Sequence, residues 1–191
     1  MKILHQEYEE NWFTERFANN VLYEYHGKWY FFRIFDNETY ELGSESLVKV
    51  YTWDFGKFNY DTNKMSFPDK ISHDIMQMAE VAKRFPFRIP VQGQNNRYIM
   101  AQILLKNDVA ANLIYDKSIH ECKFIEHFTE VVEFQPYIVT NEYVLSWCRH
   151  GALEKYVTEE MLDEDNRQKF RVLINTVEEE LNPVIIKYYF K

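Results

Sequence analysis

The chain lacks the short motifs that identify the common nucleotide-binding and hydrolytic enzymes. It contains no G-x-G-x-x-G turn, no phosphate-binding P-loop, no H-E-x-x-H zinc motif, no G-x-S-x-G nucleophile turn and no C-x-x-C pair. Each pattern places particular side chains or backbone amides around a phosphate, a metal or a scissile bond. Their absence excludes the dinucleotide-dependent, P-loop and zincin classes in their usual forms, and favours a protein that is not an enzyme.

Glycine, proline and cysteine are scarce: the 191 residues include five Gly, five Pro and two Cys. This composition argues against a loop-rich or repetitive fold. The cysteines, Cys122 and Cys148, have no metal-type spacing around them, and the start of the chain has no secretory h-region. We therefore expect reduced thiols in a cytoplasmic protein. No stretch approaches the roughly 20 apolar residues of a membrane helix, so no membrane partner is predicted.

The chain also lacks a net positive charge. It has 22 basic and 30 acidic residues, and its formal net charge is −8. Residues 1–70 carry 8 basic and 12 acidic side chains, and residues 111–191 carry 9 and 15. Nonspecific binding to a phosphate backbone needs a positive face, which the chain as a whole does not offer. The acidic balance favours basic partners.

Aromatic side chains, in contrast, are abundant: 15 Phe, 14 Tyr and 4 Trp in a chain that is 46% apolar. Burying one large apolar side chain contributes roughly 1.5–3 kcal/mol, so the material for a substantial core is present. The length fits a single domain over residues 1–191, with a division into a β-rich part (1–65) and a mixed α/β part (66–191) as the alternative.

Hydrophobic periodicity and turn signals predict an α+β fold. Residues 20–60 are typical of an antiparallel β-meander with a first turn at 26–28. Residues 98–115 fit a helix through Ile99, Ile103 and Leu104, but a strand hairpin that turns at 106–108 is the favoured interpretation. Helices are predicted at 5–19, 70–84, 118–128, 142–150 and 159–181. Residues 184–190 form a last strand. We thus expect an N-terminal antiparallel meander with helices, followed by a mostly helical C-terminal part that ends in a strand.

One stretch differs in character from the rest. Residues 83–97, KRFPFRIPVQGQNNR, contain four basic side chains and no acid. As an exposed loop, this stretch could bind nucleic acid, with its phenylalanines stacking on bases and its arginines contacting phosphates. It also suits a protein-binding edge. As a connector, it would anchor the phenylalanines in the core, and this interpretation is the favoured one. The candidate binding residues are Arg84, Phe85, Phe87, Arg88 and Arg97.

A second pattern suggests metal-dependent chemistry. The triplet Glu121-Cys122-Lys123, with an upstream aspartate at Asp108 or Asp116, resembles the D…(D/E)-x-K site of restriction-type nucleases. That resemblance implies that the carboxylates hold Mg²⁺ while Lys123 positions or deprotonates the attacking water. A solvated ion pair explains the same triplet in a chain that is 27% charged. No metal or cofactor is predicted otherwise.

The sequence therefore predicts a non-enzymatic, acidic, aromatic-rich protein that binds another macromolecule, in the manner of an inhibitor, regulator or accessory protein of a phage or mobile element. A protein partner is expected. The alternatives are a nucleic-acid binder that uses residues 83–97 and a Mg²⁺-dependent nuclease or phosphodiesterase.

Overall fold

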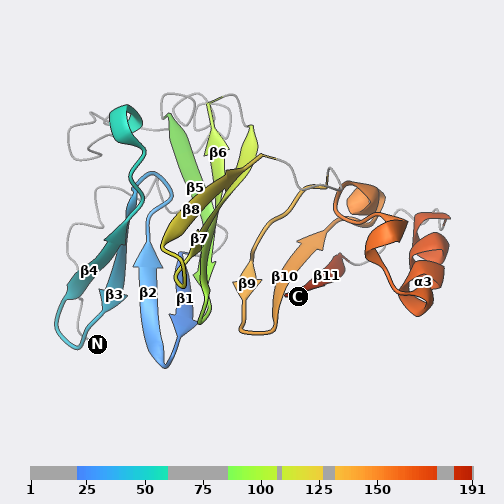
Figure 1. The fold of residues 1–191 in the computed structure, drawn as a ribbon, viewed down its shortest axis with the longest axis horizontal. Coiled ribbons are helices and arrows are strands. Elements are labelled where there is room, and N and C mark those ends of the chain that lie inside the picture. Colours follow the sequence, from blue (N-terminus) through green and yellow to red (C-terminus); the bar gives the residue numbers. More distant parts are fainter. Residues whose placement is uncertain (1–20, 60–85, 107–108, 127–131, 176–182, 191) are drawn as a thin grey trace, which may run out of the picture.

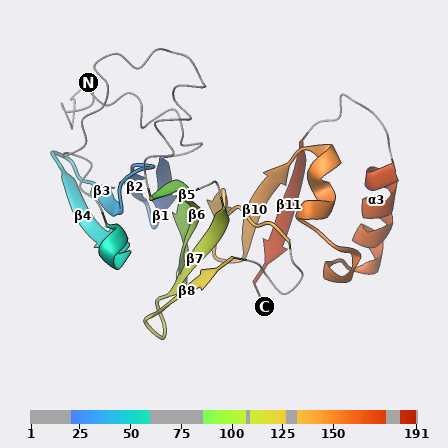
Figure 2. The same ribbon diagram turned by 90° about the horizontal axis from the view of Figure 1, so that it is seen from above.

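Three antiparallel sheets lie side by side along the long axis of the molecule (Figures 1 and 2). The computed structural model describes residues 21–59, 86–106, 109–126, 132–175 and 183–190. Sheet A is a meander of β1 (Leu22–Tyr25), β2 (Lys28–Phe32), β3 (Glu38–Leu42) and β4 (Leu47–Thr52). Sheet B is a second meander of β5 (Phe87–Gln94), β6 (Tyr98–Leu105), β7 (Ala110–Asp116) and β8 (Glu121–Ile125). Sheet C has the order β11 (Val184–Tyr189), β10 (Tyr143–Cys148), β9 (Ile138–Val139).

Helical elements gather at one end of the molecule, beyond sheet C (Figure 1). They are the 3-10 turns η4 (His150–Lys155) and η5 (Glu159–Met161) and the α-helix α3 (Glu164–Asn175); another 3-10 turn, η2 (Gly56–Phe58), follows sheet A. Phe170 of α3 and Leu153 of η4 form a buried cluster with Cys148 and Ile186 of sheet C. The helical elements therefore pack against sheet C and bury part of one of its faces.

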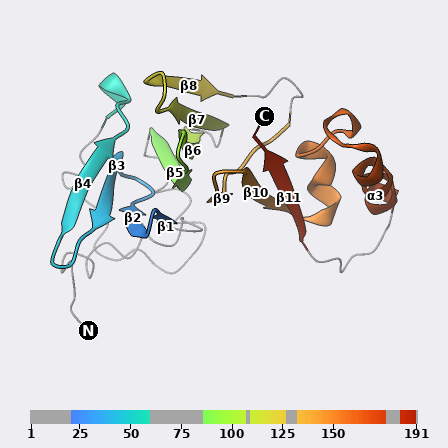
Figure 3. The same ribbon diagram turned by 60° about the horizontal axis from the view of Figure 1, so that its bottom comes forward.

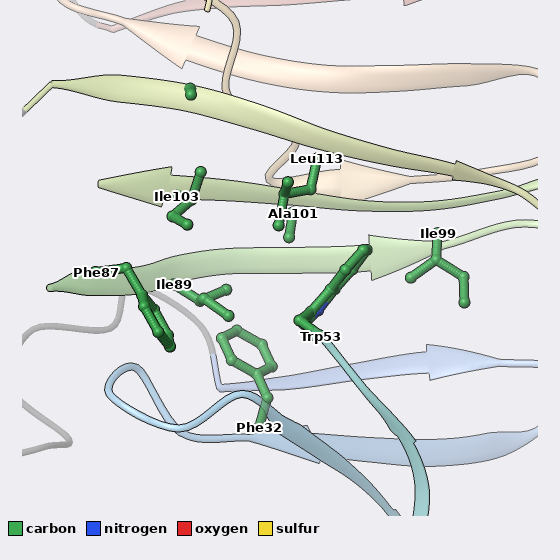
Figure 4. Close-up of a cluster of buried hydrophobic side chains, with 9 residues drawn as sticks. Phe32, Trp53, Phe87, Ile89, Ile99, Ala101, Ile103 and Leu113 are labelled. Carbon is green, nitrogen blue, oxygen red and sulfur yellow. The ribbon is translucent and has the colours of Figure 1, made fainter. Parts of the chain in front are cut away.

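The main core lies between sheets A and B. Phe32 of β2 and Trp53, just after β4, point toward apolar side chains of sheet B (Figure 4). In sheet B these side chains are every second residue, because successive residues of a strand point to opposite faces. The sheet B members of this core are Phe87, Ile89, Ile99, Ala101, Ile103, Ala111 and Leu113. The other face of sheet B turns toward sheet C, where Met100 packs with Phe134 and Val144.

The prediction of an α+β fold with a mostly helical C-terminal part is wrong, because the described chain is mostly β and has a single α-helix. Two predicted helices are strands: residues 118–128 contain β8, and residues 142–150 contain β10. In the sequence, Ser118 and Asn141 resemble the N-caps of these two predicted helices, but in the structure they have other roles. Ser118 donates to the Asp116 carboxylate, and Asn141 accepts from the backbone of Asn96. Neither side chain is therefore a helix cap.

Several other predictions are confirmed. The N-terminal meander with its turn between β1 and β2 is present, as are the hairpin of β6 and β7 and the terminal strand β11. The long helix predicted at 159–181 is present in part: α3 covers 164–175, and Asp163 accepts a hydrogen bond from the backbone of Asn166 at its start. The helices predicted at 5–19 and 70–84 lie outside the described residues.

Candidate functional site

The basic stretch 83–97 mostly becomes strand β5 and its turn. Phe87 is 2% exposed in the main core, and Arg88 is half-buried. Phe87 is therefore not available to stack on a base. Arg97 is exposed, but its guanidinium is paired with Asp116. Arg84 and Phe85 lie outside the described residues.

The amide side chains of the same stretch join the sheets. Gln92 is 3% exposed and faces sheet A, where its Oε1 accepts from Trp53 Nε1 at 2.7 Å. Its Nε2 donates to Thr39 Oγ1 at 2.9 Å and to Tyr51 OH at 2.7 Å. Tyr51 is in turn hydrogen bonded to Tyr23. Burial raises the pKa of both tyrosines, so both hydroxyls stay protonated.

The turn between β5 and β6 ties three hairpins together. Asn95 donates to the backbone carbonyl of Thr140 at 2.8 Å, in the turn between β9 and β10. Asn96 Oδ1 lies 2.7 Å from Nε2 of His26, in the turn between β1 and β2. The amide-rich turn, which looks like a solvated loop in the sequence, is thus a structural junction.

Asp116, a predicted metal ligand, already has partners. Its Oδ1 accepts from the Ser118 hydroxyl at 2.6 Å and from the Ser118 amide at 2.9 Å. Its Oδ2 accepts from Arg97 Nε at 3.0 Å and Nη2 at 2.9 Å. These hydrogen bonds from Ser118 and Arg97 lower the pKa of Asp116 to about 2.

We predict that Asp116→Asn lowers the melting temperature at neutral pH and that this loss shrinks in acid. The pKa of Asp116 in the folded chain is about 2, against about 4 for an aspartate in an unfolded chain. A carboxylate with a lowered folded-state pKa stabilises the fold above its unfolded pKa, and this contribution is lost as the pH falls toward its folded pKa. Melting curves of both proteins from pH 7 to pH 2 test this. A difference that stays constant with pH would contradict it.

The E-x-K triplet lies on a strand rather than a helix. Asp116 of β7 is directly opposite Glu121 of β8, and Lys123 is opposite Ile114, so Asp116, Glu121 and Lys123 share one face of sheet B. Asp108 lies outside the described residues. No cluster of three or more His, Cys, Asp or Glu side chains suited to a metal occurs in the part of the chain that the structure describes.

The outward face of sheet C is the strongest candidate for a binding site. The register pairs Tyr143 with Tyr189, Leu145 with Lys187, and Trp147 with Ile185, so all six side chains share one face. The alternate residues of both strands point into the cores. Ile185 is 71% exposed, Tyr189 65% and Trp147 42%. We call these six residues the sheet C face.

Aromatic stacking and one cation order this face. Tyr137 stacks on Trp147, with ring centroids 5.6 Å apart. Lys187 Nζ lies 3.8 Å from the ring centroid of Tyr143 and 4.8 Å from that of Tyr189. A hydrogen bond with Tyr189 raises the pKa of Lys187, which keeps the ammonium charged. The face is therefore apolar and aromatic with one central positive charge, and it presents rigid rings to solvent.

Sequence reasoning missed this face because it assigned residues 142–150 to a helix. The signal that could have found it is the alternation in YVLSWC (143–148), where Val144, Ser146 and Cys148 are buried while Trp147 is exposed. A period of two over six residues is typical of a strand.

No family model matches the chain, and no curated protein matches it. Among solved structures, the chain is similar to the crystal structure of a candidate exported protein from Bacteroides fragilis NCTC 9343, with a TM-score of 0.54 and 14% sequence identity. The match covers 90% of this chain and 49% of the other, so this chain spans about half the length of that protein. At this identity the similarity shows the fold alone. The word "exported" conflicts with our expectation of a cytoplasmic location, but it describes the other protein, and the location stays a prediction.

None of the helices in the described ranges is long and apolar enough to cross a bilayer.

Proposed function

We propose that the chain is a non-enzymatic binding protein and that another protein docks on the sheet C face. The observation that carries this proposal is the exposure of Trp147, Ile185 and Tyr189 side by side on two paired strands. Aromatic residues are enriched among the side chains that dominate binding energy, and charged residues are depleted from the centre of an interface. Five of the six residues in the sheet C face fit that composition, with Lys187 as the exception.

The charge of the chain indicates the kind of partner. The formal net charge is −8, which raises the encounter rate with a protein of net positive charge. Lys187, within the face, fits a partner side chain that carries a carboxylate or a carbonyl oxygen. We therefore expect the partner to be a basic protein with an apolar patch. In this complex the chain would act as an inhibitor or accessory protein.

The two alternatives have less support. Nucleic-acid binding through residues 83–97 loses one of its two proposed base-stacking residues, because Phe87 is buried in the core. A Mg²⁺-dependent nuclease would need Asp116 to exchange Arg97 and Ser118 for a metal ion. The juxtaposition of Asp116, Glu121 and Lys123 on one face of sheet B keeps that alternative as a prediction.

We predict that Trp147→Ala weakens binding of the partner by about thirtyfold, the effect of losing roughly 2 kcal/mol at a hot spot. The partner is captured from the source cells with the tagged chain, identified, purified, and titrated by calorimetry against the wild type and the variant. Trp29→Ala is the matched control, because Trp29 is 51% exposed on sheet A, and it should leave the affinity unchanged.

Three outcomes would count against this proposal. If Trp147→Ala and Trp29→Ala lose the same amount of affinity for the partner, the sheet C face is not the binding site. A dimer in light scattering that dissociates in Trp147→Ala would assign the face to a second copy of the chain. A monomer with no reproducible partner would leave the face without a binding function.

A further inference from the structure

A cavity of about 420 Å³ lies between sheets B and C, where Val144 and Tyr188 line it from the buried side of sheet C and Tyr189 from the sheet C face. Most of its wall is apolar. Ile114 of β7 and Ile125 of β8 line it from sheet B, while Val144 of β10 and Phe190, just after β11, line it from the C-terminal part. Small-molecule sites are typically concave, mostly apolar and roughly 300–1,000 Å³ in volume. The cavity therefore has the size and the lining of a ligand site.

The arrangement of the sheets explains why this space is open. Figure 3 shows β9 beside β5, at one edge of sheet B. There the backbones approach closely, because a methyl group at Gly93 would lie only 2.8 Å from Val139 Cγ2. The cavity is lined instead by residues of β6, β7 and β8, toward the opposite edge of sheet B. The two sheets are thus in close contact at β5, and the cavity lies nearer to β8.

Charged groups gather in one part of the cavity wall. Arg97, Asp116 and Lys123 all line it. Arg97 and Asp116 neutralise each other in their ion pair. Lys123 is exposed and makes no hydrogen bond or ion pair with any residue of the described chain. The wall therefore combines an apolar interior with one ammonium group that has no ion-pair partner among the described residues.

We propose that this cavity binds a small amphipathic anion, with an apolar chain inside the cavity and a carboxylate at Lys123. The apolar wall provides the affinity through burial of the chain. A charge-assisted hydrogen bond from Lys123, with the Arg97 guanidinium as a second neighbour, selects for the anionic end. Tyr189 of the sheet C face also lines this cavity, but Trp147 and Ile185 do not, and the site does not depend on the proposed function.

The test uses decanoate as the probe, titrated by calorimetry below its micellar concentration, with 1-decanol and decyltrimethylammonium as neutral and cationic analogues. We expect decanoate to bind about tenfold more tightly than decanol, the discrimination expected of one charge-assisted hydrogen bond, and the cation to bind most weakly. Lys123→Gln should remove the preference for decanoate over decanol. Lys49→Gln, which changes a lysine of sheet A paired with Glu38, should keep it.

A second variant tests the apolar part of the site. Ile125→Trp, on the edge strand β8, places a larger side chain in the cavity and should weaken decanoate and decanol alike. Circular dichroism and a melting curve establish that this variant is folded. Absence of decanoate binding to the wild type would overturn the proposal. So would binding that is unchanged in both Lys123→Gln and Ile125→Trp. Trp147→Ala should bind decanoate as the wild type does, so a failure here is distinguishable from a failure of the proposed function.

Discussion

Replacing Gln92 with leucine is expected to destabilise the fold by about 3 kcal/mol, although leucine is apolar and similar in size. Gln92 is 3% exposed and makes three hydrogen bonds to sheet A, with Trp53, Thr39 and Tyr51. Leucine would remove the hydrogen bonds of Gln92 to the Trp53 indole N–H and the Thr39 hydroxyl, and would leave Tyr51 with Tyr23 as its partner. Each such orphaned group costs about 1–3 kcal/mol unless it finds water or another acceptor. Urea unfolding followed by circular dichroism measures the loss.

A matched control and a rescue make this prediction specific. Gln168→Leu changes an exposed glutamine of α3 and should alter the stability by less than about 0.5 kcal/mol. Adding Trp53→Phe to Gln92→Leu removes the orphaned indole N–H, so the double variant should be more stable than the sum of the two single changes predicts. Strict additivity would show that the Trp53–Gln92 hydrogen bond contributes little.

The Gln92 network explains why the sequence was misleading at residues 83–97. Amide side chains and prolines are ordinary loop residues, and this composition favours a connector. In the structure, Pro90 is accommodated because the register of β5 and β6 shifts between Arg88 and Val91, which is a β-bulge. The amides then serve as partners for buried hydroxyl and indole groups of a sheet more than 30 residues away in the sequence. No local pattern encodes such a long-range pairing.

The strands that the sequence predicted best have local signals. The turn between β1 and β2 contains Gly27 at φ 72° and His26 at φ 53°, in the left-handed region that glycine adopts freely. The aromatic flanks of that turn fit a sheet. The hairpin of β6 and β7 pairs two apolar runs, between which the sequence has polar residues. Local chemistry specifies the first turn, whereas residues 98–115 also fit a helix in the sequence and become strands through the pairing of β6 with β7.

The strands that the sequence missed have conflicting local signals. In β8, ECKFI, charged and apolar residues are compatible with either a short helix or a strand, and an upstream serine resembles a helix cap. What decides the outcome is pairing with β7, where Leu113 is opposite Phe124. For the same reason the sheet C face could not be predicted, because it exists only when β10 pairs with β11.

Gly93→Ala is expected to destabilise the fold by about 1–3 kcal/mol, the usual cost of inserting a methyl group into a filled space. Gly93 is buried in β5, and the new methyl would lie 2.8 Å from Val139 Cγ2 and 3.2 Å from Val139 Cβ. Sheet C would have to move away from sheet B at this point. Chemical denaturation measures the loss. Gly151→Ala is the matched control, because nothing lies within 4 Å of a methyl group there.

A second substitution separates steric overlap from a backbone effect. If the contact with Val139 causes the loss, Val139→Ala should be less harmful in the Gly93→Ala background than in the wild type, because it removes the methyl group that overlaps. If glycine is needed for its backbone freedom instead, the losses of stability caused by the two substitutions should be additive. Steric overlap would also move β9, where sheets B and C are in close contact, and should therefore change the affinity for decanoate. A Gly93→Ala protein that is as stable as the wild type would mean that the two sheets are not held together at this point.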